Sequence, residues 1–105
     1  MIIYNTTYHV DDEVHEKYIN YIKTIYIVKA LSSGFLFEPR FARIHPQHEE
    51  SGKSYSLQFK IKNVDTLNYW YETEGQQLQN EFTTLFGNKA LGFVTLLEEI
   101  NIEYD

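Results

Sequence analysis

The alternation of apolar and polar residues along the chain predicts four β-strands. We expect these strands over residues 2–10, 35–45, 55–62 and 89–100. In the third of them, Tyr55, Leu57 and Phe59 alternate strictly with polar residues, which indicates one buried face and one polar face. Pro39 interrupts the second strand and cannot donate a ladder hydrogen bond, so this strand is expected at an edge of the sheet.

A helical period predicts one helix in each of the two long stretches between these strands. In the first stretch the apolar stripe consists of Val14, Tyr18, Tyr21, Ile22, Ile25 and Val28, and in the second of Leu67, Tyr71, Leu78, Phe82 and Leu85. Asp11 or Asp12 can cap the first helix, and Asn63 or Asp65 can cap the second. Gly75 lies in the middle of the second helix and predicts a kink, a break or a close contact there.

The resulting order of elements predicts an α+β fold of the ferredoxin-like kind. In this βαββαβ sandwich, a four-stranded antiparallel sheet carries two helices on one face. The last strand is apolar on both faces, with Leu91, Phe93 and Leu97 on one face and Ala90, Val94 and Leu96 on the other. Because the helices cover only one face, a second copy is expected to cover the other, as in the dimeric α/β-barrel type. We therefore expect a homodimer through the sheet face.

Length and composition limit the expected number of domains, the expected partners and the expected location. With 105 residues we expect a single ferredoxin-like domain over residues 1–105, ending in a short acidic tail over residues 101–105. The formal net charge of −6 opposes binding to nucleic acid and to anionic membranes, so neither partner is expected. The chain has no Cys and no pattern typical of a signal peptide or membrane span, which favours a cytoplasmic location.

Several short motifs, taken in their order and spacing, resemble those of a known bacterial family. They are MIIYN, VDDEVHE, LSSGF and FGNKALGFVTLLEEI. The chain resembles the bacterial domain of unknown function 4286 family nearly from end to end, which implies a ferredoxin-like fold of the dimeric α/β-barrel group. The family has no assigned activity, so the resemblance implies none. Its pattern has His-Ile-Pro where this chain has Tyr26, Ile27 and Val28, and Arg where this chain has Val94, so no functional residue is carried over.

Five residues are candidates for contact with a ligand. Tyr26, Trp70 and Tyr71 are aromatic residues that could form the wall of a pocket for a small apolar or aromatic molecule, although packing in the core is the alternative. Asn5 and His9 lie on one face of the first strand, where they could orient a polar group or act as a base. Hydrogen bonding across the dimer is the alternative for these two residues.

Metal and cofactor chemistry is disfavoured by the motifs. His45 and His48 have the spacing H-x-x-H in a predicted loop and lack the helical i, i+4 geometry of the zincin motif, so we expect a polar loop and no metal. The chain also has no G-x-S-x-G motif and no glycine-rich phosphate loop, and no cofactor is expected.

The leading functional hypothesis is a homodimeric binding or interaction module with no catalytic constellation. The first alternative is a cofactor-independent enzyme of the monooxygenase or isomerase kind, with a pocket between helices and sheet that uses Asn5, His9 or Trp70. The second is a small-molecule sensor. Both alternatives rest on fold analogy, which does not by itself imply function.

Overall fold

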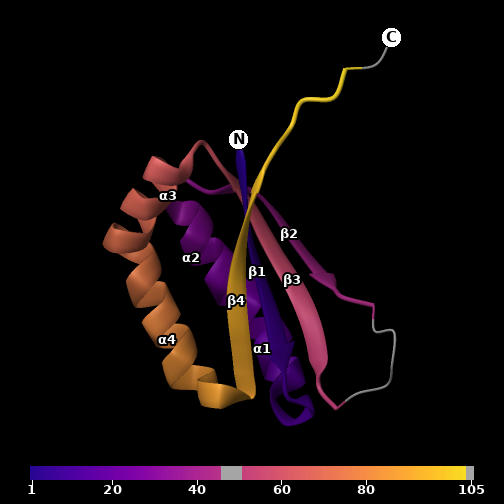
Figure 1. Ribbon diagram of the computed structural model, residues 1–105. Helices are drawn as coiled ribbons and strands as arrows, with labels where there is room; N and C mark the ends of the chain where they lie inside the picture. The colour runs from indigo at the N-terminus through magenta and orange to yellow at the C-terminus, as the bar shows by residue number, and fades with distance from the viewer. Residues whose placement is uncertain (46–50, 104–105) are drawn as a thin grey trace.

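The computed structural model describes residues 1–45 and 51–103 and shows a sheet with helices on one face (Figure 1). The strands are β1 (Ile2–Val10), β2 (Phe37–Arg43), β3 (Lys53–Ile61) and β4 (Ala90–Glu98). They form one sheet in the order β2-β3-β1-β4, and every neighbouring pair is antiparallel. This arrangement confirms the predicted ferredoxin-like α+β fold, and it places the strand that contains Pro39 at an edge, as predicted.

Each of the two helices is interrupted by a π-helical segment. The first helix consists of α1 (His15–Tyr21), a π segment (Ile22–Tyr26) and α2 (Ile27–Ser32), and the second of α3 (Val64–Trp70), a π segment (Tyr71–Gly75) and α4 (Gln76–Phe86). Short 3₁₀ turns, Asp12–Val14 and Gly87–Lys89, precede the first helix and follow the second.

The two helices begin differently. Asn63 caps the second helix as predicted, because its Oδ1 accepts a hydrogen bond of 2.8 Å from the backbone N–H of Thr66. The predicted aspartate cap of the first helix is wrong, since Asp11 makes no side-chain capping bond there. The carboxylate of Asp12 instead accepts hydrogen bonds from the backbone N–H of Gly52 at 3.1 Å and from Lys53 Nζ at 3.0 Å, which ties the helix start to β3.

The π segments change which residues face the sheet. A π turn uses i→i+5 hydrogen bonds, so it holds one more residue than an α turn and advances the buried stripe by one position. In the first helix Tyr26 and Ala30 are therefore buried, whereas Ile25 and Val28, predicted to be buried, are exposed. In the second helix, Trp70 and Phe86 are buried and the predicted Tyr71 and Leu85 are exposed, but Trp70 precedes the π segment, so the segment does not account for its burial.

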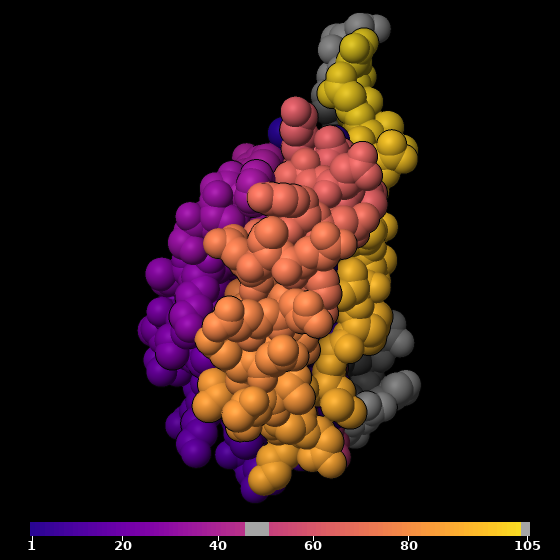
Figure 2. All heavy atoms as spheres, turned by 90° about the vertical axis from the view of Figure 1, so that its left-hand side faces the viewer, coloured from indigo at the N-terminus to yellow at the C-terminus, as the bar shows by residue number. Residues whose placement is uncertain are grey.

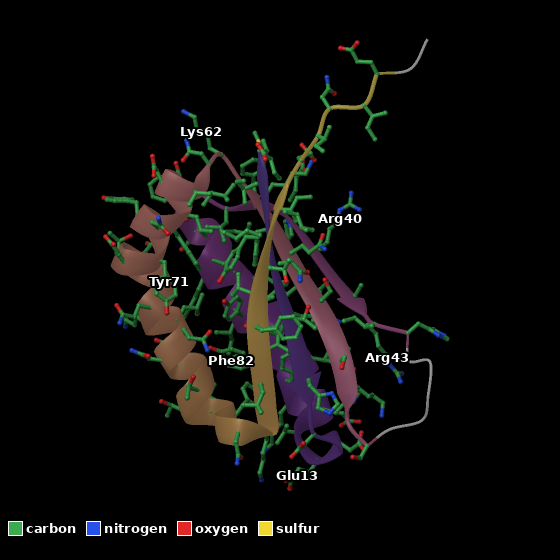
Figure 3. All side chains as sticks on the ribbon, viewed as in Figure 1. Glu13, Arg40, Arg43, Lys62, Tyr71 and Phe82 are labelled. Atoms are coloured by element: carbon green, nitrogen blue, oxygen red, sulfur yellow. The ribbon has the colours of Figure 1, made fainter. Side chains whose placement is uncertain are left out.

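The core between the helices and the sheet is largely aromatic. Its largest fully buried side chains are Trp70, Tyr8, Tyr18, Phe59 and Phe82. Figure 3 shows Phe82 pointing from α4 toward the sheet, where its ring centroid lies 4.9 Å from that of Tyr8. Burying each such side chain contributes roughly 1.5–3 kcal/mol, and tilted or edge-to-face contacts between rings add to this.

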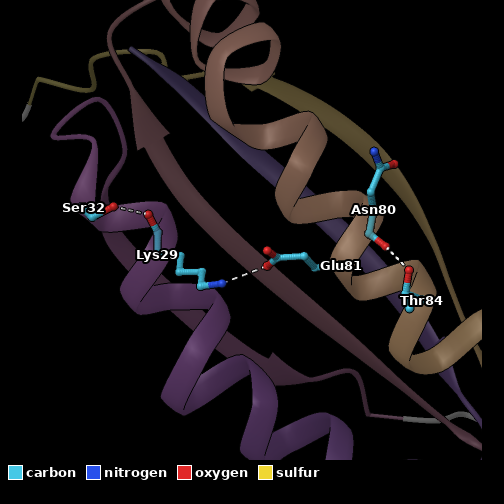
Figure 4. Close-up of polar contacts among 5 residues, drawn as sticks. All are labelled: Lys29, Ser32, Asn80, Glu81 and Thr84. Atoms are coloured by element: carbon cyan, nitrogen blue, oxygen red, sulfur yellow. Dashed lines mark hydrogen bonds and ion pairs between the residues drawn. The ribbon is translucent and has the colours of Figure 1, made fainter.

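The two helices lie side by side over the core, as the space-filling view shows (Figure 2). An ion pair of 2.9 Å between Lys29 Nζ and Glu81 Oε2 joins α2 to α4 on the outer surface (Figure 4). Both side chains are well exposed, so this pair contributes little to stability. The two helices lie on one face of the sheet and leave the other face without a helix (Figure 1).

Candidate functional site

The face of the sheet opposite the helices has no element packed on it among residues 1–45 and 51–103 (Figure 1). Directly paired residues of an antiparallel sheet share a face. By this rule the open face carries Ile3, Asn5, Thr7 and His9 from β1, their partners Lys60, Gln58, Ser56 and Ser54 from β3, and Leu97, Thr95, Phe93 and Leu91 from β4. We call this surface the open face.

The β4 side of the open face is apolar. The exposed fractions of Leu91 and Phe93 are 62% and 64%, and that of Leu97 is 43%. Leu91 and Phe93 are neighbours on this face of β4, and Thr95 separates them from Leu97, which pairs with Ile3 of β1. Exposed apolar side chains gathered in this way usually mark a binding surface, whereas single ones on a surface need no explanation.

The centre of the open face is polar, and its side chains are bonded to one another. Ser56 Oγ donates a hydrogen bond of 2.5 Å to Asn5 Oδ1, and Asn5 Nδ2 donates one of 3.1 Å to Thr7 Oγ1. Asn5 is buried even though no helix covers it. His9 Nδ1 lies 3.1 Å from Ser54 Oγ at the far end of the same strand pair.

Charged residues gather where the open face meets β2. Lys60 Nζ lies 3.0 Å from a carboxylate oxygen of Glu38 and 3.0 Å from one of Glu99. The hydrogen bonds to Glu99 and Glu38 raise the pKa of the Lys60 ammonium, and the same contact lowers the pKa of Glu99. Arg40 also lines this region, which forms a shallow depression of about 250 Å³ on the open face.

The backbone at Glu38 explains how this cluster forms. Glu38 has a φ of +49°, a left-handed conformation that non-glycine residues rarely adopt. The register between β2 and β3 shifts between Phe37 and Arg40, so Glu38 and Pro39 occupy a bulge at the sheet edge. Sequence analysis missed Glu38, Lys60 and Glu99 as neighbours, because the pattern of residues does not show the register of β2. The unusual Glu-Pro step within a strand was the available signal for the bulge.

The five predicted ligand-contacting residues do not come together. Asn5 and His9 lie on the open face, whereas Trp70 and Tyr26 are buried on the helix side of the sheet, with exposed fractions of 1% and 3%. Tyr71 lies on the second helix (Figure 3) and is 42% exposed. The structure thus separates them into a polar group on the open face and an aromatic group on the helix side.

Trp70, like Tyr18 and Tyr21, has a buried polar side-chain atom without a hydrogen-bond partner among the described residues. Its indole Nε1 is buried and makes no hydrogen bond with any residue that the structure describes. The ring packs against Tyr4 of β1, with centroids 6.0 Å apart, and against the backbone of Gly75. An unpaired buried N–H is costly and is therefore uncommon in folded proteins.

The predicted polar loop between β2 and β3 is described only in part. His48 lies outside the described residues, and the described residues contain no group of three His, Cys, Asp or Glu side chains placed to hold a metal ion. Among the helices that the structure describes, none is long and apolar enough to cross a membrane.

Comparisons with known proteins agree with the architecture. The family described as a domain of unknown function (DUF4286) matches residues 1–100. No curated protein matches the chain in sequence.

Three solved structures share the fold at low sequence identity. HapK from Hahella chejuensis has a TM-score of 0.72 at 11% identity, covering 100% of this chain and 98% of that protein. A candidate antibiotic biosynthesis monooxygenase from Deinococcus radiodurans has a TM-score of 0.68 at 16% identity, covering 99% and 100%. A dimeric ferredoxin-like protein from an uncultured marine organism has a TM-score of 0.64 at 18% identity, covering 94% and 97%. At these identities the likeness shows the ferredoxin-like fold alone.

Proposed function

The chain belongs to the DUF4286 family of domains of unknown function, and we propose that it works as a homodimeric interaction module whose open face binds the open face of a second copy. The observation that carries this proposal is the row of Leu91, Phe93 and Leu97, exposed on a sheet face that no described element covers. Two solved neighbours are themselves described as dimeric ferredoxin-like proteins, which supports the same assembly here.

Energetics favour burial of this row. Removing one Leu or Phe side chain from water contributes roughly 1.5–3 kcal/mol, and a two-fold interface contributes each residue twice. Association costs an estimated 4–15 kcal/mol in lost translational and rotational freedom. The side chains are 43–64% exposed, so the six of them, three from each copy, contribute roughly 5–10 kcal/mol, which is comparable to that cost.

The polar part of the open face is compatible with the same interface. Asn5, Thr7 and Ser56 already bond to one another, so covering them leaves few groups without a partner. Lys60 is paired with two carboxylates, which avoids burying an isolated charge. An interface with an apolar part and a bonded polar part is typical of proteins that exchange between free and associated states. The absence of Cys fits a reducing, cytoplasmic setting for such a module.

A charge placed in the apolar row tests the proposal. Phe93→Glu should convert the dimer to a monomer, because the interface would bury two unpaired carboxylates. Sedimentation equilibrium over a range of concentrations measures the dissociation constant, and we expect it to rise at least a hundredfold. Circular dichroism of the variant should stay that of the folded protein.

Val28→Glu is the matched control. Val28 is 60% exposed, similar to Phe93, but it lies on the outer surface of α2. This variant should dimerise like the unmodified chain. A monomeric unmodified chain at high concentration, or an equal effect of both variants, contradicts the proposed interface.

A second candidate function is favoured by the unpaired Nε1 of Trp70. An unpaired buried donor beside Tyr4 is a group that a small apolar or aromatic ligand between helices and sheet could satisfy, as an enzyme or a sensor would require. The name of the Deinococcus radiodurans neighbour points in the same direction.

Native mass spectrometry of protein isolated from its own host tests this second candidate. A ligand held by Trp70 should appear as a fixed additional mass on the polypeptide, and Trp70→Phe should release it because Phe has no N–H donor. A spectrum that shows the polypeptide without any additional mass argues against this function and leaves the interaction module as the proposal.

A further inference from the structure

The outer edge of β4 is an exposed strand edge. β4 pairs only with β1 in the sheet of described residues, so one side of its backbone lacks ladder partners. Val94 and Leu96 point to the helix side, because they pair with Thr6 and Tyr4, yet they are 53% and 44% exposed. Ala90 on the same side is buried, so the helices cover the start of β4 but not Val94 and Leu96. A long strand edge that is apolar on both faces promotes association with another strand unless something covers it.

The segment that follows β4 has the features of a covering strand. After Glu99, whose N–H donates to the carbonyl of Met1 at 2.9 Å, residues 100–103 extend away from the body of the protein (Figure 1). Ile100 and Ile102 are 79% and 67% exposed, and they alternate with the polar Asn101 and Glu103. This alternation is that of a strand with one apolar face.

The segment does not fit the edge of its own β4. It continues in the direction in which β4 ends, and a return to that edge would use at least two of its residues for the turn. Residues 99–103 contain neither Gly nor Pro, and Asn101 is the one residue among them of a type that favours such turns. Pairing with the β4 edge of a second copy requires no such turn of the chain.

We propose that residues 100–103 of each copy lie along the outer edge of β4 in the other copy as a short added strand. Ile100 and Ile102 would then cover Val94 and Leu96, and the added backbone would pair with the free side of β4. The exchange is continuous with the open-face interface, since Leu91, Phe93 and Leu97 belong to the same strand. This inference rests on the proposed homodimer.

The absence of Cys allows a direct test with one spin label. One chain, without isotope labels, has the substitution Asn101→Cys and carries a nitroxide on this cysteine. It is mixed with a ¹⁵N-labelled chain that has no Cys. Only contacts between copies can then broaden ¹⁵N signals. We expect broadening of the backbone amides of β4 around Val94 and Leu96, and no such broadening from a label at Val28→Cys. Signals that keep their widths at β4, or that broaden only elsewhere, overturn the exchange.

Deletion of residues 100–105 provides a second measurement. Losing the burial of even one Ile side chain weakens binding by roughly tenfold, so the dimer dissociation constant should rise at least tenfold. A deleted chain that dimerises like the full chain overturns the exchange and leaves the open-face dimer standing. A full chain that is monomeric refutes both proposals, so the two failures are distinguishable by sedimentation.

Discussion

Gly75 and Trp70 show how one small residue sets the packing of the second helix. A Cβ placed on Gly75 would lie 2.6 Å from Cζ3 of Trp70, and the indole is fixed in place because it is fully buried against Tyr4. The position of Gly75 in the middle of the helix predicted a close contact, and this contact is confirmed. The glycine is required here by the indole, since its own φ is that of an ordinary helix.

We predict that Gly75→Ala destabilises the protein. In an open helix this change would stabilise by about 1 kcal/mol. Here the added methyl group overpacks the core, which typically costs about 1–3 kcal/mol, so we expect a net loss of about 1 kcal/mol. Urea unfolding followed by circular dichroism measures it. In a Trp70→Phe background, which lacks the outer indole ring, the same Gly75→Ala change should cost less, and an unchanged cost would contradict the contact.

Asp12 connects the start of the first helix to β3 through its carboxylate. Two hydrogen bonds lower the pKa of the Asp12 carboxyl group. The larger effect comes from the Gly52 backbone N–H, and the next from Lys53. A carboxyl group with a lowered folded-state pKa stabilises the fold above its unfolded-state pKa, and this stabilisation is lost as pH falls through the folded-state pKa.

The prediction for Asp12→Asn concerns the pH dependence of stability. The variant should be less stable than the unmodified chain at neutral pH, because the contact with the Lys53 ammonium loses its charge. The difference should shrink as the solution is acidified and Asp12 becomes protonated. Urea unfolding of both proteins at several pH values measures this, and a difference that is constant with pH would refute the role of the ionised carboxylate.

At the scale of elements, the π segments determine which helical residues reach the core. Each accommodates one residue more than a regular helix and rotates the following turns. In the first helix, Lys23 and Thr24 lie exposed within the π segment, whereas Tyr26 at its end and Ala30 after it are buried. Removing one exposed residue should therefore restore a regular α-helix without moving the buried residues.

Deletion of Lys23 tests this explanation. We expect a folded protein with a stability within about 1–2 kcal/mol of the unmodified chain, since Tyr26 and Ala30 keep facing the sheet. Deletion of Thr83, an exposed residue in the regular α4, should destabilise far more because it turns Phe86 away from the core. Thermal unfolding compares the two, and equal losses would show that the π segment does not absorb the change.

The buried faces of the strands were easier to predict from the sequence than those of the helices. The strand faces were predictable because a period of two residues repeats without drift, so Tyr55, Leu57 and Phe59 are buried as expected. The first halves of both helices were predictable for a similar reason. In the first helix the stripe shifts within the π segment, so Ile25 and, after it, Val28 were assigned wrongly, because residue types do not indicate where a π turn forms.

The candidate site was predictable in part. The pattern of β4 placed Leu91 and Phe93 on one apolar face without showing that this is the uncovered one, and the pattern of β1 placed Asn5 and His9 together. The sequence did not show that Trp70 lies on the opposite side of the sheet from Asn5 and His9. That inference requires knowing on which side the helices pack. The cluster around Lys60 depends on a bulge in an edge strand and becomes visible only with the register of β2.

The whole molecule is flat and covered on one side only. Its shortest extent is 20 Å, against 44 and 37 Å in the other directions, which corresponds to one sheet with one layer of helices. The radius of gyration of 14.6 Å exceeds the roughly 13 Å expected for a compact domain of this size. Pairing two open faces would give a thicker and more nearly spherical particle.

Isotope-filtered NOE spectroscopy on a mixture of ¹³C-labelled and unlabelled chains tests the open-face dimer most directly. The filter selects proton contacts between two copies, so it identifies the interface as well as the association. We predict contacts to the partner from the side chains of Leu91, Phe93 and Leu97. The absence of such contacts, or contacts only from the outer surfaces of α2 and α4, would contradict the open face as the site at which this protein binds its second copy.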